Sequence, residues 1–379
     1  MIDLNAFQEL LIKSKIEFIT GVPDTLLNDF CLHIEGNWPS DKHVIAANEG
    51  NSIALATGYY LATGKIPIVY MQNSGVGNAL NPLISLTHPS VYGIPMILLI
   101  GWRGEPGAKD HSQHTKQGIL TPVFMDDVDI PWKRLTDNFS EVENAFIWAI
   151  ETANETSGPV ALLVPKGVME KGEKSGFSGD EDFLSREEAI DLIVGMFPKE
   201  TVFVASTGRI TRELYEVRNM RGEGHENDFL NVGAMGHTSS IATGLAIALQ
   251  DRNVVCLDGD SAAIMHLGSL AVNASRDLKN YTHIVLNNGA HESVGGQDSV
   301  GLIVNLTGIA ANMGFVTVKE RIESRKELED AFNALKSSVG PRFFDIRIRK
   351  GMRADMPILK FSQKENKQRL MQNLKCEQS

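Results

Sequence analysis

The sequence predicts an α/β protein of two domains, each built on a parallel sheet with helices packed against it. Its 379 residues suffice for two domains of roughly 150 residues each. Short β-rich runs alternate with helix-length segments in both halves, which is typical of parallel sheets. A polar, glycine-bearing stretch separates the halves. With 42% apolar and 22% charged residues, the composition is that of a globular protein and excludes wholesale disorder.

The first domain is expected over residues 1–168. Residues 1–16 mix charged and apolar residues and predict an amphipathic helix; they lack the apolar segment and cleavage site of a secretory signal. The strands predicted after it are Glu17–Thr20, Val44–Ala47, Ile66–Met71, Met96–Ile100 and Val160–Val164.

The second domain is expected over residues 186–379, after a linker at 169–185 that shows neither helical nor strand periodicity. Ser185 and Glu188 have capping-box spacing, so a helix is expected to begin between them. The charged tail after Lys350 is predicted to form a surface or subunit-docking helix. The predicted strands are Thr201–Ala205, Val254–Leu257, His283–Leu286, Phe315–Val318 and Phe343–Ile348.

Charge and cysteine content exclude several classes of protein. The 36 Lys and Arg against 47 Asp and Glu give a net charge of −11, which argues against general nucleic-acid binding. Cys31, Cys256 and Cys376 are far apart, so a disulfide scaffold is not expected and a cytoplasmic location fits. The longest apolar run, Ile94–Trp102, is about half the length needed to cross a bilayer, so no membrane segment is expected.

Two segments only superficially resemble phosphate-binding loops. Asn73–Asn78 follows a strand and contains Gly-Val-Gly, but Leu80 stands where a dinucleotide loop needs its third glycine. Gly64-Lys65 lacks the upstream glycine of a P-loop and is followed by Ile66. Neither an NAD nor an ATP enzyme is therefore indicated.

Two predicted strands of the second domain end in small and oxygen-bearing residues. Asp260 follows one strand and Asn288 follows the other, 28 positions later. Parallel strands place ligand sites at their carboxyl ends, so both side chains are expected to converge. The Asp260 carboxylate, the Asn288 amide oxygen and a nearby backbone carbonyl, taken as that of Ala290, are hard ligands suited to Mg²⁺. Gly259 and Ser261 permit close backbone approach, and helix amides starting near Ser261 can receive an anion.

Each of these pieces could alone be a turn, since Gly-Asp and Asn-Asn-Gly are common turn sequences. Together they resemble the pattern of thiamine diphosphate enzymes, Gly-Asp-Gly followed further along the chain by Asn-Asn. Ser261 departs from the commonest glycine, and the spacing is one residue longer than usual. The resemblance implies two thiamine diphosphate-binding-fold domains, one for the pyrimidine ring and one for the diphosphate, with thiamine diphosphate and Mg²⁺ as cofactors.

The resemblance also assigns roles at three further places. Glu49, after the strand Val44–Ala47, would bond the pyrimidine nitrogen, although it could alone be a carboxylate favoured at a helix start. Met235 would be the apolar wedge that supports the bent cofactor, and the Gly233 carbonyl would accept a hydrogen bond from the amino group of the cofactor. A Met in such a loop is otherwise most often part of the hydrophobic core. The residues expected to donate to the diphosphate are Thr207 and Gly208.

The short linker indicates a form without the middle domain that many members carry. The closer resemblance, over nearly the whole chain to about Asp355, is to phosphonopyruvate decarboxylases, with sulfopyruvate decarboxylases as the main rival. It implies non-oxidative decarboxylation of 3-phosphonopyruvate to phosphonoacetaldehyde and CO₂. The segments that carry it are Gly21–Leu27, Met71–Asn78, Gly101–Gly107, Ser206–Leu214 and His291–Gln297.

A substrate with a phosphonate and a carboxylate requires local cations. The candidates in the resembling segments are Arg103, Lys109, Arg209 and Arg212, each of which could instead be a solvated surface charge.

Proton transfer has three candidate residues. Asp24, which follows a strand, is expected to contact substrate and to protonate the reacting carbon; it could also cap the following helix. His111 and His114 are expected to relay protons from a loop, with plain loop polarity as the alternative.

The resemblance implies an obligate homo-oligomer, because in this family each site lies between the pyrimidine domain of one subunit and the diphosphate domain of another. Two rival functions stay open. One is a dehydrogenase-type component that passes its product to a lipoyl partner, and the other is a non-catalytic cofactor-binding module.

Overall fold

The computed structural model describes residues 1–169, 182–318 and 320–376. The chain divides into two compact units: the first contains residues 1–169 together with Val294–Gln297, and the second contains the other described residues. Of the linker predicted at 169–185, residues 170–181 lie outside the described residues. Within the described ranges, no helix has both the length and the apolar character needed to span a bilayer.

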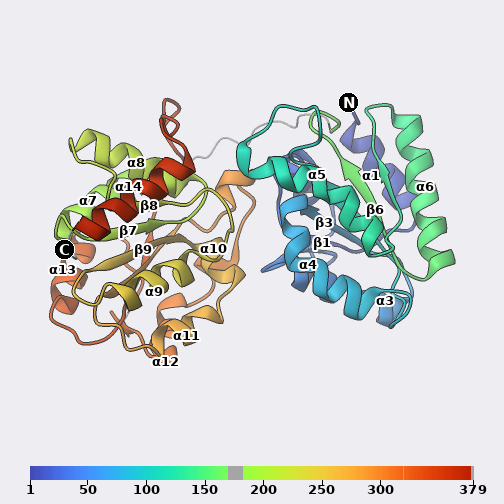
Figure 1. Ribbon diagram of the computed structural model, residues 1–379. Helices are drawn as coiled ribbons and strands as arrows, with labels where there is room; N and C mark the ends of the chain where they lie inside the picture. The colour runs from blue at the N-terminus through green and yellow to red at the C-terminus, as the bar shows by residue number, and fades with distance from the viewer. Residues whose placement is uncertain (170–181, 319, 377–379) are drawn as a thin grey trace. The chain divides into compact units, whose positions relative to one another are not determined.

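A six-stranded sheet in the order β2-β1-β3-β4-β6-β5 forms the first unit, and every strand pair in it is parallel (Figure 1). The strands are β1 (Ile19–Gly21), β2 (His43–Ile45), β3 (Ile68–Gln72), β4 (Met96–Gly101), β5 (Trp132–Arg134) and β6 (Pro159–Val164). All six residues of β4 are buried, because helices cover both faces of the sheet and a central strand then needs an unbroken apolar run. The short edge strand β5 was not among the strands predicted from the sequence.

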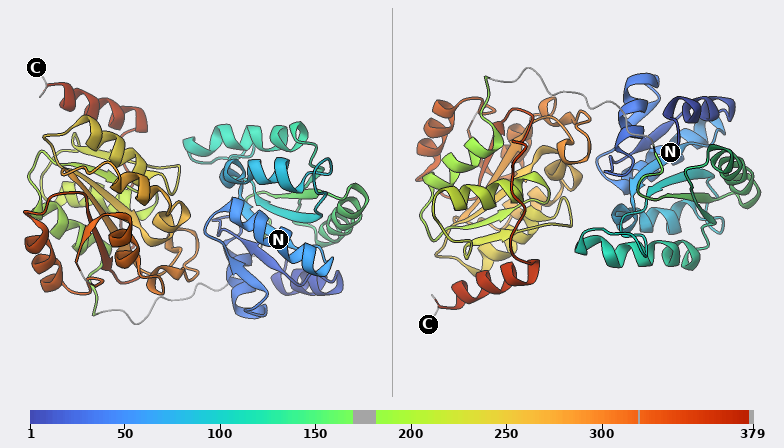
Figure 2. Two further views of the ribbon diagram at one scale, coloured as in Figure 1. Left: turned by 90° about the horizontal axis from the view of Figure 1, so that it is seen from below. Right: turned by 90° about the horizontal axis from the view of Figure 1, so that it is seen from above.

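Helices cover both faces of this sheet (Figure 2). One face packs against α1 (Leu4–Lys13), α2 (Asn28–Asn37) and α6 (Phe139–Thr156). The other packs against α3 (Glu49–Thr63), α4 (Val76–Pro82) and α5 (Ser112–Asp127). Two single-turn helices, η1 (Asn73–Gly75) and η2 (Leu83–Thr87), flank α4. The amphipathic first helix is confirmed: it buries Leu4, Phe7, Leu10 and Leu11.

The second unit has the same architecture, with a parallel six-stranded sheet in the order β11-β12-β10-β9-β7-β8. Its strands are β7 (Val202–Ala205), β8 (Asp228–Leu230), β9 (Val254–Gly259), β10 (Tyr281–Asn287), β11 (Val316–Thr317) and β12 (Arg342–Arg347). The predicted capping box is present: Ser185 accepts from the Glu188 amide, and the Glu188 carboxylate accepts from the Ser185 amide. The short edge strand β8 was likewise not among the predicted strands.

Helices again form two layers around the sheet. One layer consists of α7 (Arg186–Met196), α8 (Arg209–Met220) and α13 (Arg325–Leu335). The other consists of α9 (Thr238–Ala248), α10 (Asp260–Met265), α11 (Ser269–Ala274) and α12 (Leu306–Met313), with Leu370 of α14 (Gln363–Cys376). The single-turn helices are η3 (Glu292–Val294) and η4 (Val300–Leu302).

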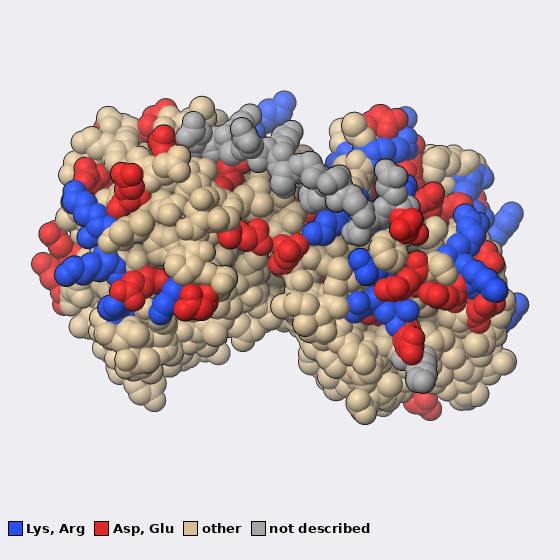
Figure 3. All heavy atoms as spheres, turned by 180° about the vertical axis from the view of Figure 1, so that it is seen from behind, with Lys and Arg blue, Asp and Glu red and all other residues tan. Residues whose placement is uncertain are grey.

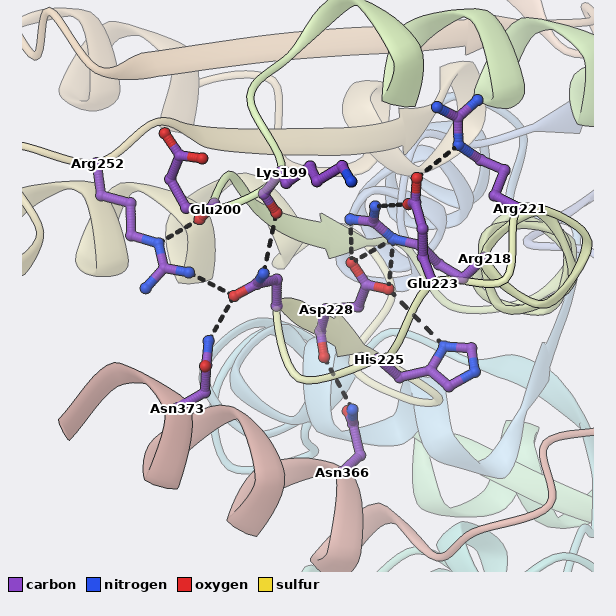
Figure 4. Close-up of polar contacts among 11 residues, drawn as sticks. Lys199, Glu200, Arg218, Arg221, Glu223, His225, Asp228, Arg252, Asn366 and Asn373 are labelled. Carbon is purple, nitrogen blue, oxygen red and sulfur yellow. Dashed lines mark hydrogen bonds and ion pairs between the residues drawn. The ribbon is translucent and has the colours of Figure 1, made fainter. Parts of the chain in front are cut away.

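The tail helix α14 completes the edge of the second sheet at β8 (Figure 4). The buried Asn366 side chain accepts from the Leu230 amide at 2.9 Å and donates to the Asp228 carbonyl at 2.8 Å, as a neighbouring strand would. Arg218 holds the other side of Asp228 through an ion pair of 2.9 Å. The predicted surface helix is therefore part of the folded unit.

Candidate active site

Strand register brings the carboxyl ends of four strands of the second unit to one edge of its sheet. Leu286 pairs with Gly259, Leu257 with Ala205, and Ala205 with Leu230. The segments after β7, β8, β9 and β10 therefore begin side by side, where parallel sheets bind ligands.

Asp260 is the first residue of α10 and is 2% exposed. Burial raises the pKa of the Asp260 carboxyl to about 6. The Ser299 hydroxyl donates a hydrogen bond to this carboxyl and lowers the pKa by a smaller amount. No ion pair joins Asp260 to a basic side chain within the described residues. A buried carboxylate without a cation nearby is a suitable ligand for a divalent ion.

The two adjacent asparagines at the end of β10 have different environments. Asn287 donates from its amide to the Gly301 carbonyl at 2.8 Å and to Asp345 at 3.0 Å, so it braces the loop. Asn288 donates to Glu292 at 2.8 Å, while its amide oxygen accepts from the Ala290 backbone at 3.1 Å and retains a second lone pair. The Asn287 oxygen likewise accepts one backbone amide, that of Gly289 at 3.2 Å, so Asn288 remains the candidate ligand on the strength of the sequence motif.

Buried hydroxyl groups at the same edge fit a phosphate group. The side-chain oxygens of Ser206, after β7, and Ser261, after β9, are buried and have no hydrogen-bond partner within the described residues. Gly208 has φ of 100°, which a residue with a side chain rarely adopts, and it directly precedes α8. The donor set around Asp260 thus suits a diphosphate and Mg²⁺ together. Thr207, predicted as a further donor, lies in the same segment and is half-buried.

The loop after β8 carries the predicted wedge. Met235 is half-buried, between Ala234 with φ of 50° and Gly236 with φ of 85°. A side chain at position 236 would press on His266 and Met265. The loop is anchored by Thr211, which donates to the Asn231 carbonyl at 2.7 Å, and by the Gly233 amide, which donates to the Asn231 side chain at 3.1 Å.

In the first unit, Glu49 follows β2 as the first residue of α3 and is 6% exposed. The Asn78 amide donates to its carboxylate at 2.7 Å. A Cβ at Gly75 would collide with this carboxylate, so the glycine makes room for it. The Glu49 side chain is thus held in one place at the carboxyl edge of the sheet.

Asp24 and Arg103 lie at the same edge, after β1 and β4. Asp24 is fully buried, which raises its pKa to about 6; the nearby Arg103 charge opposes this more weakly. Arg103 forms a two-bond ion pair with Asp110, at 2.8 and 2.6 Å, and donates to Thr25 at 2.6 Å. This pairing lowers the pKa of Asp110, so the pair is charged at neutral pH. Arg103 is therefore a fixed cation, partly neutralised by Asp110.

The remaining predicted residues of this loop differ in exposure. Lys109 and His111 are exposed, and His111 precedes α5 without a side-chain capping bond. His114 is half-buried, and burial, aided by the Arg103 charge, lowers its pKa, so it is neutral at pH 7.

The basic residues of α8 have partners within the second unit. Arg209 donates to the Glu292 carboxylate at 2.7 Å and to the Glu292 carbonyl at 3.0 Å. Arg212 donates to the carbonyls of Met356 and Pro357 at 2.6 and 3.2 Å. Arg212 thus holds the segment before α14, whereas Arg209 stays at the carboxyl edge.

Buried charges that were not predicted from the sequence lie behind Arg209. Arg186 pairs with both Glu213 and Glu292, and all three are at most 5% exposed. Capping-box spacing explained why Arg186 begins a helix, but no local pattern indicated its distant partners.

A second group of possible ligand atoms lies in the core. Cys256, Asp258 and His283 are buried, with ligand atoms within 4.8 Å of one another. A thiol and an imidazole favour softer ions than Mg²⁺. The oxygen-rich set at Asp260 and Asn288 is thus the better Mg²⁺ site.

Acidic and basic side chains are interspersed on the face seen in Figure 3, with wide areas that carry neither. This face shows no continuous basic patch of the kind that binds nucleic acids.

Two family models match the chain, one in each unit. Residues 4–124 match the family described as thiamine pyrophosphate enzyme, N-terminal TPP binding domain, and residues 206–346 match its C-terminal TPP binding domain. The predicted fold class is confirmed.

The relatives include decarboxylases of both expected kinds. Phosphonopyruvate decarboxylase from Streptomyces viridochromogenes is 31% identical over 348 residues, which is 88% of this chain and 85% of the relative. Sulfopyruvate decarboxylase from Methanosarcina acetivorans is 25% identical over 389 residues, which cover 97% of this chain and 96% of the relative. Sulfopyruvate decarboxylase subunit alpha from Methanocaldococcus jannaschii is 37% identical over 162 residues, which cover 42% of this chain and 90% of the relative. The chain therefore belongs to the phosphonopyruvate decarboxylase family of thiamine pyrophosphate enzymes.

Proposed function

We propose that this protein decarboxylates 3-phosphonopyruvate to phosphonoacetaldehyde and CO₂ with thiamine diphosphate and Mg²⁺. The observation that carries the proposal is the match to a phosphonopyruvate decarboxylase over 85% of that relative's length. In the reaction the C1–C2 bond breaks, CO₂ leaves without the bonding electron pair, and a proton takes its place on the former keto carbon. Thiamine diphosphate, when bound, supplies the electron sink for that pair.

The two units offer complementary parts of a cofactor site. Asp260, Asn288 and the Ala290 carbonyl would bind the metal ion, and the donors at Ser206, Thr207, Gly208 and Ser261 would receive the diphosphate. Glu49, buried and fixed by Asn78, would hold a proton at the pyrimidine ring. Gly233 and Met235 would support the cofactor between its rings.

Asp24 is the proposed proton donor to the product. Its pKa of about 6 lies close to neutral pH, which favours a group that must both hold and release a proton. His114, neutral at pH 7, and the exposed His111 can pass protons between the site and solvent.

Arg103, Lys109 and Arg209 are the proposed contacts for the anionic groups of the substrate. Arg103 and Arg209 are held in place by acidic partners, so they are oriented before substrate binds and lose little side-chain entropy.

We further propose a homo-oligomer in which each site combines the first unit of one subunit with the second unit of another. A relative named as subunit alpha matches only 42% of this chain. The matching residues therefore occur in that relative as a separate subunit, which supports a site built from more than one chain.

Sulfopyruvate is the second candidate substrate, because a sulfopyruvate decarboxylase matches 97% of the chain. A side-by-side assay of CO₂ release from phosphonopyruvate, sulfopyruvate and pyruvate, with Mg²⁺ and thiamine diphosphate, separates the candidates. The highest kcat/KM is expected for phosphonopyruvate. Preference for sulfopyruvate would favour the second candidate, and no CO₂ release without a lipoyl protein would favour a dehydrogenase-type component.

A further inference from the structure

Glu292 lies at the centre of a buried group of charges in the second unit, which we call the Glu292 cluster: Arg186, Arg209, Glu213 and Glu292. Arg186 joins the two acids, contacting Glu292 directly and Glu213 at 3.0 Å. The side chains of Arg186, Glu213 and Glu292 are 2–4% exposed, whereas that of Arg209 is 25% exposed.

The four acceptor sites of the Glu292 carboxylate are filled. One oxygen accepts from Arg186 and from the Asn288 amide at 2.8 Å. The other accepts from Arg209 at 2.7 Å and from the Gly351 backbone. A carboxylate held by four donors cannot rotate without breaking charge-assisted bonds, so its position is fixed.

This fixed carboxylate acts with the Ala290 backbone amide, which donates to the Asn288 oxygen at 3.1 Å, to set which way the Asn288 amide points. A carboxylate accepts only, so the Asn288 nitrogen must face Glu292 and the Asn288 oxygen must face away from it. The reversed amide would set an oxygen against two negatively charged oxygens. Groups behind a metal ligand commonly orient it in this manner.

We propose that Glu292 is a positioning residue that orients the amide oxygen of Asn288 toward the metal ion. The proposal rests on the proposed function, because it takes Asn288 as a metal ligand. It assigns to Glu292 a role distinct from that of Glu213, which shares Arg186 but does not contact Asn288.

The test compares Glu292→Gln with Glu213→Gln in the full-length protein. Mn²⁺ serves as the probe, and its affinity in the presence of thiamine diphosphate is measured from the electron paramagnetic resonance signal of free Mn²⁺. For Glu292→Gln the dissociation constant is expected to rise roughly 10- to 100-fold, because the amide has a single acceptor oxygen. With that oxygen kept at Arg209 and Gly351, the amide nitrogen faces Arg186 and Asn288, and Asn288 loses its acceptor. Glu213→Gln, equally buried, is expected to change it less than about 3-fold.

A double variant keeps the test decisive if Glu292→Gln folds poorly. In Glu292→Gln/Asn288→Asp the donor and acceptor exchange places, so the hydrogen bond and an oxygen ligand are both restored. Mn²⁺ affinity is expected to recover toward that of wild type. Equal loss of affinity in Glu292→Gln and Glu213→Gln, or no recovery in the folded double variant, would overturn the proposal. If wild type shows no thiamine diphosphate-dependent Mn²⁺ binding, the proposed function itself is wrong.

Discussion

Glu49 is the residue on which the proposed chemistry depends most directly. Glu49→Gln keeps the shape of the side chain and a group that can bond Asn78, but it removes the charge that holds a proton. We expect turnover to fall by at least about 100-fold, as for loss of an acid–base group, while Mn²⁺ and thiamine diphosphate still bind. Single-turnover CO₂ release checks this expectation, and turnover close to wild type would falsify the assignment of Glu49.

The buried carboxyl of Asp24 makes stability depend on pH. The pKa of Asp24 is about 6 in the folded chain and 3.8 ordinarily, so folding favours its protonated form. This contribution to the free energy of unfolding is complete below pH 3.8 and is lost as the pH rises through about 6. The difference corresponds to about 3 kcal/mol. Asp24→Asn removes the buried charge, so its Tm is expected to exceed that of wild type at pH 8, and this advantage is expected to shrink to about half at pH 5.

Asp110 is the matched control, because its pKa is lowered by the ion pair with Arg103. The ion pair of Asp110 with Arg103 stabilises the fold at neutral pH, and this stabilisation is lost when acid protonates the Asp110 carboxylate. Asp110→Asn should therefore reduce the Tm at pH 8. Thermal unfolding between pH 5 and pH 8 measures both variants. Equal Tm differences at the two ends of this range for Asp24→Asn would contradict the account.

The metal and pyrimidine candidates could be predicted from the sequence, whereas the groups that orient them could not. Asp260 and Asn288 stand at strand ends within one recognisable motif. Glu292 meets Arg186, 106 positions away, and this partnership arises only from tertiary packing. The role of Arg103 as a substrate cation stays a prediction; its ion pair with Asp110, seven positions later, was not predicted.

At the scale of elements, the central strands were predictable and the edge strands were not. β4 and β9 are buried on both faces, so their sequences consist mostly of consecutive apolar residues, which can be recognised without the structure. β5 and β8 have three residues each and carry charged side chains, so neither length nor periodicity marks them. β8 depends on α14, which comes about 140 residues later and pairs with its backbone.

Asn366 tests the contribution of that helix. Asn366→Ala leaves the Leu230 amide and the Asp228 carbonyl without their buried partner. We expect the free energy of unfolding to fall by about 2–4 kcal/mol, measured by urea titration. Asn373→Ala, which removes one partly buried bond to Asn227 on the same helix, should cost less than about 1 kcal/mol. Equal losses in the two variants would show that α14 does not support β8 through Asn366.

At the scale of the whole molecule, the proposed sharing of sites between subunits can be tested by mixing two inactive variants. Glu49→Gln damages the first unit and Asp260→Asn the second. Coexpression of differently tagged copies should restore activity, to about a quarter of wild type for randomly paired dimers, because half of the mixed dimers' sites combine two intact units. Restored CO₂ release supports shared sites. Complete inactivity of purified mixed oligomers would place each site within one chain.

The central claim is that one cofactor is bound by Glu49, Asp260 and Asn288. The most direct measurement is a crystal structure with thiamine diphosphate and Mg²⁺. We expect oxygens of Asp260 and Asn288 at about 2.0–2.2 Å from the ion and the Glu49 carboxylate within hydrogen-bonding distance of the pyrimidine ring. A metal ion held elsewhere, for instance by Cys256, Asp258 and His283, with Glu49 away from the cofactor, would contradict it.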